Sequence, residues 1–263
     1  MEDKNNDVLS YTNQKNLIFL LIILMFVLVL IDINVLQENL DTQMITGSLL
    51  RILGGLVFIV IIYGLGHGHI FKFKNVSKAL LIMIPAFIVS INNFPIIAFL
   101  DGRAVLTEPV YRVFLFFIES LSVGFFEEII FRGMILVYLL NKLKDEKNGV
   151  MKSIILSSVI FGFIHVINIF NGASVNSTML QIGYSFLVGM MWAVLFIKTG
   201  NLWLTMLLHA TFNFFGQVMF YLGTVDGRYD QFTTVITIII ALLAAFHTLW
   251  IFRQIKNKTL FND

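Results

Sequence analysis

Long apolar runs separated by short polar segments set the pattern of this chain. The runs cover residues 17–36, 49–66, 79–100, 109–140, 150–170, 178–198, 201–222 and 232–253. An apolar stretch of about 20 residues is long enough to cross the hydrocarbon core of a bilayer as a helix. The pattern therefore predicts an all-α, polytopic membrane protein with about eight transmembrane helices.

The composition supports a membrane protein with one domain. Hydrophobic residues make up 58% of the chain and charged residues 13%, where soluble domains average about 25% charged residues. No internal repeat is visible, and the polar stretch at residues 141–149 has the length of a loop rather than a linker. We expect residues 1–263 to form a single membrane domain, with an uncleaved first helix because its polar leader lacks a small-residue cleavage site.

The cations indicate the orientation. When eight helices alternate, one side receives Lys4, Lys15, Lys72, Lys74, Lys78, Lys142, Lys144, Lys147, Lys152, Lys198, Arg253, Lys256 and Lys258, and the other receives Arg103, Arg112 and Arg228. The positive-inside rule then predicts a multi-pass protein of the cell membrane with both termini in the cytoplasm. The lysines lie in short loops without interleaved aromatic residues. We therefore expect them to anchor the protein at the lipid bilayer and not to bind nucleic acid.

Several kinds of catalytic chemistry are excluded or disfavoured. The chain has no cysteine, which removes thiol nucleophiles and disulfides. All aspartates lie in tails, loops or helix ends, which argues against a protease with paired intramembrane aspartates. No histidine is followed by glutamate, so the H-E-x-x-H zinc motif is missing. Ser174 in "NGASVN" sits in a polar loop typical of turns and is a poor candidate nucleophile.

Ionisable residues inside the apolar runs are the remaining candidates: Arg51, Glu119, Glu127, Glu128, Arg132, His165, His209 and His247. Charged groups inside a membrane are costly and usually mark a functional site. On a helix, Glu128 and Arg132 share one face, whereas Glu127 points about 100° away. Either the Glu128 and Arg132 pair fixes the helix and leaves Glu127 as a general base, or the cluster only ties helices together.

The other ionisable residues divide by depth in the membrane. Counted from the lysine-rich ends at 1.5 Å per residue, Glu127 and His165 lie roughly 20 Å deep, and His209 and Asn213 roughly 12 and 18 Å deep. All four can therefore share one layer of the bilayer. We interpret Glu119 and His247 as structural, and Arg51 as a side chain that extends to the lipid headgroups.

Three motifs on separate runs resemble a known family. E-E-x-x-x-R is present as Glu127, Glu128 and Arg132, F-x-x-x-H as Phe161 and His165, and H-x-x-x-N as His209 and Asn213. In this order they resemble the CAAX protease and bacteriocin-processing family, also called CPBP or Abi. The resemblance covers about residues 120–217, which we expect to form the catalytic core.

The resemblance implies an intramembrane endopeptidase, a hydrolase similar to CAAX prenyl endopeptidases. Glu127 and His165 would activate a water, His209 and Asn213 would stabilise the oxyanion, and Glu128 and Arg132 would give structural support. The family is often called a metalloprotease, and its histidines and glutamates could hold a divalent metal such as zinc or work without one. We favour water activation without a metal.

Three functions remain open at this stage. The first is an endopeptidase that cuts a membrane-associated peptide or protein, such as a bacteriocin precursor, a signalling pheromone or a lipid-anchored protein. The second is a non-catalytic bacteriocin-immunity or adaptor protein that binds a toxin peptide or a sensor kinase. The third is a proton-coupled transporter, which the lack of an internal repeat disfavours. A protein that only binds has no need for Glu127, His165, His209 and Asn213 together, so the protease is favoured.

Overall fold

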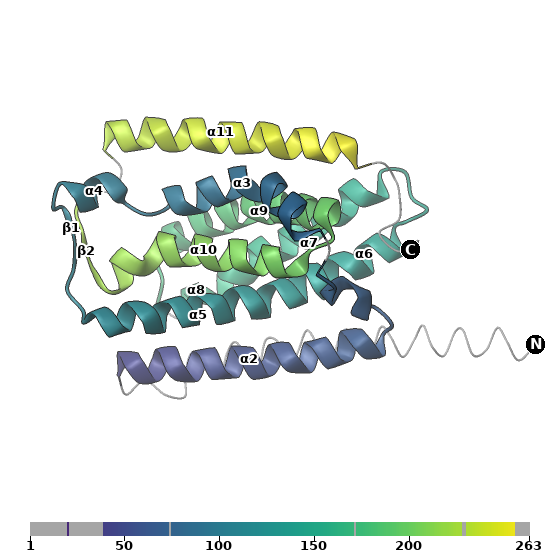
Figure 1. Cartoon of the computed structure of the whole chain (residues 1–263), viewed down its shortest axis with the longest axis horizontal. Coiled ribbons are helices and arrows are strands. Elements are labelled where there is room, and N and C mark those ends of the chain that lie inside the picture. Colours follow the sequence, from purple (N-terminus) through teal and green to yellow (C-terminus); the bar gives the residue numbers. More distant parts are fainter. Residues whose placement is uncertain (1–19, 21–38, 74, 171, 228–229, 256–263) are drawn as a thin grey trace, which may run out of the picture.

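The computed structural model describes residues 20, 39–73, 75–170, 172–227 and 230–255. The first expected helix, residues 17–36, lies outside the described residues apart from Leu20. The described chain forms an elongated bundle of helices that run back and forth along one axis (Figure 1).

The elements follow the apolar runs closely. They are α2 (Leu40–Gly64), η1 (Gly68–Phe71), α3 (Val76–Asn92), α4 (Ile96–Leu100), β1 (Ala104–Leu106), α5 (Val110–Glu128), η2 (Ile129–Leu136), α6 (Val137–Lys142), α7 (Gly149–Phe163), η3 (Ile164–Val166), α8 (Ile167–Phe170), α9 (Val175–Thr199), α10 (Leu202–Tyr221), β2 (Gly223–Val225) and α11 (Gln231–Gln254). The prediction of an all-α protein is confirmed, with β1 and β2 pairing only as a short antiparallel ribbon.

Two expected helices have different bounds. The run at residues 49–66 becomes α2, which begins at Leu40 because the Asn39 side chain accepts a hydrogen bond from the Thr42 amide at 2.8 Å and caps the helix. The run at 79–100 divides into α3 and α4. The break falls just before Pro95, which disfavours helical geometry in the residue that precedes it.

Four helical segments of the described chain are long and apolar enough to cross a membrane: Leu40–Gly64, Gly149–Phe170, Val175–Thr199 and Gln231–Gln254. Helix α3 is apolar but shorter, and α5 carries Arg112, Glu119, Glu127 and Glu128. The chain is therefore a multi-pass membrane protein, whereas a total of eight spanning helices stays a prediction.

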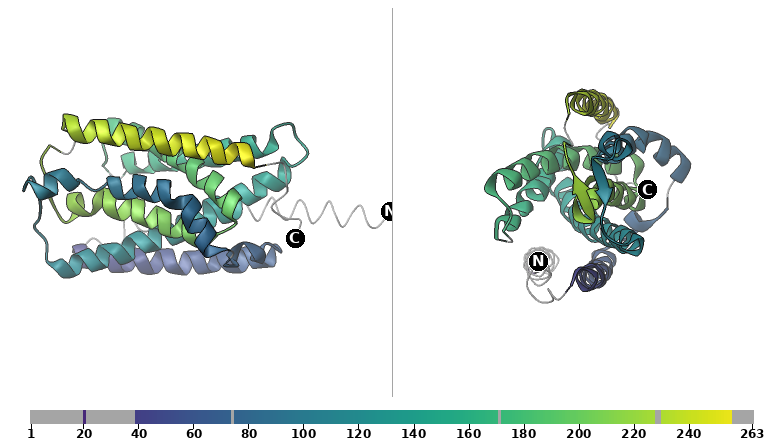
Figure 2. Two further views of the ribbon diagram at one scale, coloured as in Figure 1. Left: turned by 45° about the horizontal axis from the view of Figure 1, so that its top comes forward. Right: turned by 90° about the vertical axis from the view of Figure 1, so that its left-hand side faces the viewer.

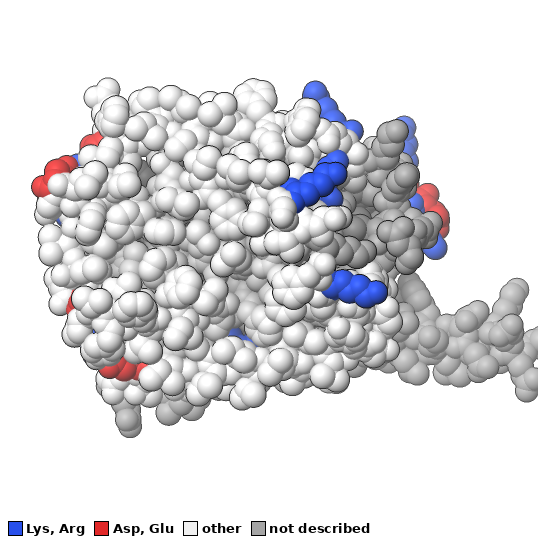
Figure 3. Space-filling model, in the orientation of Figure 1, with Lys and Arg blue, Asp and Glu red and all other residues white. Residues whose placement is uncertain are grey.

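The two ends of the bundle differ in charge. One end, which we call the lysine end, carries the loops after α2, α6 and α9 and the end of α11, and it holds most of the described Lys and Arg (Figure 3). The other end, which we call the ribbon end, carries β1 and β2, which lie across the bundle when it is viewed along its axis (Figure 2). Acidic side chains show at this end (Figure 3).

Helices α5 and α10 pack side by side in the centre of the bundle. Their closest approach is at Gly124, where an added Cβ would lie 2.6 Å from the Met206 carbonyl oxygen and 2.9 Å from the Ala210 nitrogen. A glycine at this position therefore lets the two backbones touch. The contact brings the end of α5, with its paired glutamates, beside the middle of α10.

Candidate active site

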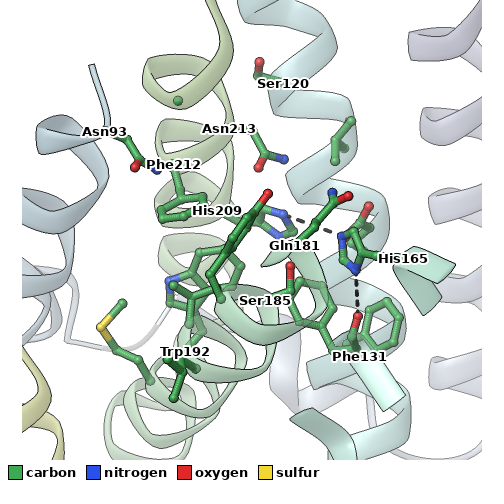
Figure 4. Close-up of a pocket in the computed structure, with 18 of the residues that line it drawn as sticks. Asn93, Ser120, Phe131, His165, Gln181, Ser185, Trp192, His209, Phe212 and Asn213 are labelled. Atoms are coloured by element: carbon green, nitrogen blue, oxygen red, sulfur yellow. Dashed lines mark hydrogen bonds and ion pairs between the residues drawn. The ribbon is translucent and has the colours of Figure 1, made fainter. Parts of the chain in front are cut away.

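A cavity of about 910 Å³ lies inside the bundle. It is lined by residues of α2, α3, α5, η2, η3, α8, α9, α10 and α11 and by Phe161 of α7. Glu127, His165, His209 and Asn213, which the sequence places in one layer, all line it. Figure 4 shows His165, His209 and Asn213 around the same space. The four residues therefore border one cavity, while their shared layer in the bilayer and their roles stay predictions.

The ion pair predicted between Glu128 and Arg132 is present. Arg132 Nη1 lies 2.5 Å from Glu128 Oε1, and the two side chains are 3% and 0% exposed. The Arg132 guanidinium also packs 4.5 Å from the centre of the Phe161 ring and 5.2 Å from that of Trp192. A cation over aromatic faces gains electrostatic energy from their quadrupoles, which helps to hold this charge in an apolar core.

The helix changes its winding directly after the paired glutamates. Ile129–Leu136, which contains Arg132, forms a π-helical segment between α5 and α6. Such segments occur mostly as interruptions of α-helices and are frequent at functional sites. A regular α-helix is expected here from the sequence, and no local signal marks the change.

His209 connects the two glutamates. Its Nδ1 lies 2.9 Å from Glu128 Oε1, and its Nε2 lies 3.7 Å from Glu127 Oε2. The ring lies against Trp192, with 4.4 Å between ring centres. A carboxylate oxygen accepts, so Nδ1 carries a proton and donates, which turns Nε2 toward Glu127.

The adjacent glutamates therefore have different surroundings. The Glu128 side chain is fully buried between Arg132 and His209, whereas the Glu127 side chain is 28% exposed and lines the cavity. The sequence pointed to the Arg132 contact of Glu128, four residues away, but not to its His209 contact, which spans 81 residues. Glu128 thus holds His209 in place as well as neutralising Arg132.

His165 lies in the short η3 turn that follows α7. Its Nδ1 is 3.0 Å from the Phe161 carbonyl oxygen. Because a carbonyl only accepts, Nδ1 carries the proton, and in the neutral ring Nε2 is left as the basic nitrogen. This arrangement suits a histidine that accepts a proton from a bound water.

Other residues singled out in the sequence lie away from this chemistry. Ser174 caps α9, since its hydroxyl accepts a hydrogen bond from the Ser177 amide at 3.1 Å. His247 lies on α11 with its ring 6.0 Å from that of Trp250, and it is not among the described residues that line the cavity.

Arg51 differs from its expected place. Its side chain is expected to extend to the headgroups, but Arg51 Nη1 lies 3.4 Å from Glu119 Oε1, and both residues line the cavity. Helix α2 begins at Leu40, so Arg51 sits about 16 Å along it rather than near its end. The two residues are on different helices, and their spacing in sequence gave no sign of the pair.

A metal site does not fit this arrangement. Among the described residues, no group of three or more His, Asp or Glu side chains is placed so that it could hold a metal ion. Instead, Glu128 Oε1 and His209 Nδ1 are hydrogen-bonded to each other. No catalytic step is therefore derived through a metal.

The comparisons with known proteins agree with the motifs. Residues 109–215 match the family described as type II CAAX prenyl endopeptidase Rce1-like. This confirms the resemblance to the CAAX protease family, and the matched segment contains all three motifs and overlaps the expected core at residues 120–217. No curated protein and no solved structure matches the chain. Fold, cavity and family together define a multi-pass membrane protein with a CAAX protease family segment.

Proposed function

We propose that the protein is an intramembrane endopeptidase that hydrolyses a peptide bond in a membrane-associated peptide or protein. One observation carries the proposal. A carboxylate with access to the cavity, Glu127, lies beside His209 Nε2 at 3.7 Å, and His165 and Asn213 line the same cavity. A structural polar cluster would need no open space at these groups.

In the proposed reaction, a water molecule in the cavity is the nucleophile. Glu127 accepts a proton from the water, with His165 Nε2 as a second acceptor, while the water oxygen forms a bond to the carbonyl carbon of the substrate. The carbonyl oxygen takes the negative charge. The proton then passes to the amide nitrogen of the leaving peptide as the carbon–nitrogen bond breaks.

His209 and Asn213 are proposed to stabilise the oxyanion. They lie four residues apart on α10 and line the same cavity. The Asn213 amide and, in the doubly protonated ring, His209 Nε2 are the donors. Preorganised donors of this kind contribute about 3 to 4 kcal/mol each to transition-state stabilisation in other proteases. Glu128, paired with Arg132, holds the His209 ring, and neither residue is proposed to touch the reacting atoms.

The proposal is tested by comparing membranes that contain the wild-type protein with membranes that contain Glu127→Gln. Released peptides are identified by mass spectrometry. We expect fragments that need Glu127, each with a precursor that accumulates in the variant. If both membranes release the same peptides while the cellular phenotype is retained in the variant, the protein is instead a non-catalytic immunity or adaptor protein.

A further inference from the structure

Side-chain amides recur among the polar groups of the cavity lining. Five carboxamide side chains line the cavity: Asn93, Asn168, Gln181, Asn213 and Gln217. A carboxamide is uncharged and carries both a hydrogen-bond donor and an acceptor, as a peptide group does. The lining is therefore suited to a ligand that is itself made of amide groups.

Two of these carboxamides are bonded to each other. Asn168 of α8 donates from Nδ2 to Gln181 Oε1 of α9 at 2.7 Å. Both residues are only partly buried. The bond joins the short α8 segment to α9 and fixes how the two amide groups are turned.

The bond uses only part of each amide group. A carboxamide has two donor hydrogens on its nitrogen and an oxygen that accepts. The bond leaves Asn168 Oδ1 and Gln181 Nε2 unused, and these two side chains make no other hydrogen bond within the described part of the chain. The pair therefore offers one acceptor and one donor to a ligand in the cavity.

An extended peptide has the matching groups. Each of its residues presents one N–H donor and one C=O acceptor, which need partners when the chain leaves water. In an antiparallel sheet, two opposite residues exchange an N–H···O bond in each direction. The pair of Asn168 and Gln181 can make the same two bonds to one residue of a peptide.

The pair lies close to the proposed catalytic groups. Asn168 follows His165 by three residues, in the consecutive segments η3 and α8. Residues three apart lie on one face of such a turn, about 5 to 6 Å from each other. An extended peptide rises about 3.3 Å per residue. A peptide held by the pair therefore places a peptide bond at His165 one or two residues further along.

The wall on α9 continues from the pair to the other catalytic histidine. Gln181, Ser185, Val188 and Trp192 all line the cavity, and their spacing of three and four residues is that of one helix face. The Trp192 ring lies 4.4 Å from the ring of His209. Figure 4 shows Gln181, Ser185, Trp192 and His209 around the same space.

We infer that Asn168 and Gln181 bind the main chain of the peptide substrate beside the scissile bond. The choice of a peptide as the ligand rests on the proposed function. Main-chain groups are common to all residues, so the pair orients the substrate as an extended strand without selecting its side chains.

The test must separate this role from a purely structural one. In Gln181→Glu, the carboxylate still accepts the bond from Asn168 Nδ2, but it has no donor for a peptide carbonyl. This variant therefore keeps the link between α8 and α9 and removes the proposed contact. Gln181→Met keeps the length of the side chain and removes both.

Binding is measured without cleavage, in purified protein that carries Glu127→Gln, which we call the parent protein. The probe is a capped peptide of four leucines, one of them with a photoreactive diazirine, added in detergent. The cross-linked fraction against peptide concentration gives the dissociation constant. We expect Gln181→Glu and Gln181→Met each to raise it by about two- to tenfold, the effect of losing one hydrogen bond.

Asn92 offers the matched control. It donates from α3 to Thr237 Oγ1 of α11 at 3.0 Å, and neither residue is among the described residues that line the cavity. Asn92→Leu therefore removes a carboxamide bond between two helices away from the ligand. We expect it to lower the thermal stability while the dissociation constant stays that of the parent protein. An equal loss of binding in this variant would contradict the inference.

A second probe tests the contact at the level of single atoms. Replacing one amide N–H of the peptide with an ester oxygen removes the donor that would bind Asn168 Oδ1. At one position, this ester should weaken binding to the parent protein and make little further difference in Asn168→Leu. Such non-additivity is the sign of a direct contact, and additive losses at every position would exclude it.

Two further results would overturn the inference. The capped peptide could fail to bind the parent protein, although the proposed recognition does not depend on side chains. Gln181→Glu could bind it as tightly as the parent protein, which would make the pair only a structural link.

The inference and the proposed function fail separately, because binding is measured in a variant that does not need to cleave. If the binding pattern holds but wild-type membranes release no peptide that depends on Glu127, the proposed function is wrong and the pair binds peptide in a non-catalytic protein. If cleavage depends on Glu127 but the binding pattern is absent, only the inference is wrong.

Discussion

Two arginine–glutamate pairs lie inside the bundle, and they differ in almost every physical respect. Arg132 and Glu128, which we call the floor pair, are buried beside the cavity and are not among the residues that line it; they lie on one continuous helix at 2.5 Å, with side chains 3% and 0% exposed. The pair in the wall, Arg51 and Glu119, joins α2 to α5 at 3.4 Å, with side chains 23% and 17% exposed. The same residue types therefore serve a rigid support in one place and a polar lining in the other.

The difference is one of solvation. Removing one partner of a fully buried pair leaves an uncompensated charge and typically costs about 3 to 5 kcal/mol. A pair that borders an open cavity keeps access to water, so losing one partner costs much less. Glu127, which lies next to the floor pair in sequence but opens to the cavity, belongs to neither group and is the residue proposed to do chemistry.

The largest effect is expected from Glu127→Gln. Glutamine keeps the shape and most of the hydrogen bonding but cannot accept a proton, so the cleavage rate should fall by at least about a hundredfold. Abundance in the membrane should stay near wild type, because the contacts of Glu128 with Arg132 and His209 are untouched. Cleavage of a membrane substrate is followed by mass spectrometry, and a normal rate would exclude Glu127 as the base.

The second effect is on stability, at the floor pair. Arg132→Met leaves Glu128 buried without its cation, so the protein should lose a few kcal/mol of stability, and its abundance should drop together with its activity. The double variant Glu128→Gln with Arg132→Met should recover part of the abundance, since neither partner is then charged. Immunoblots of membranes measure the abundance of both variants. If Arg132→Met is as abundant as the wild type, the pair does not stabilise the fold.

A smaller effect is expected at the wall pair. Glu119→Gln removes the carboxylate but keeps the shape, and the partly exposed pair should contribute about 1 kcal/mol or less to stability. Thermal unfolding in detergent should therefore shift much less for Glu119→Gln than for Arg132→Met, which is the matched comparison. Similar shifts in the two variants would mean that the cavity is not open to water at Arg51.

The smallest effect is expected from chelation. Because the Glu128 carboxylate and the His209 imidazole are hydrogen-bonded to each other, we expect purified protein to keep its peptidase activity after exhaustive treatment with a chelator. The measurement is the cleavage rate before and after treatment, with added zinc as the control. Activity that is lost and then restored specifically by zinc would turn Glu127, His165 and His209 into candidate ligands.

The sequence by itself determined the local features of the protein. Apolar runs of membrane length predicted the helices, and those of α9, α10 and α11 came within a few residues of their observed bounds. The four-residue spacing of Glu128 and Arg132 predicted their contact, because residues at this spacing face each other along one helix. The depth count predicted one shared layer for Glu127, His165, His209 and Asn213, since the rise per residue of a helix is fixed, and the four residues line one cavity.

Only the tertiary structure decided which side chains of different helices lie in contact. The close approach at Gly124 sets which turn of α10 lies beside Glu128, and so brings His209 to it across 81 residues of sequence. The same holds for Arg51 and Glu119, 68 residues apart. Helical periodicity fixes which face a residue occupies, whereas the neighbour of that face depends on how side chains of the whole bundle fit together.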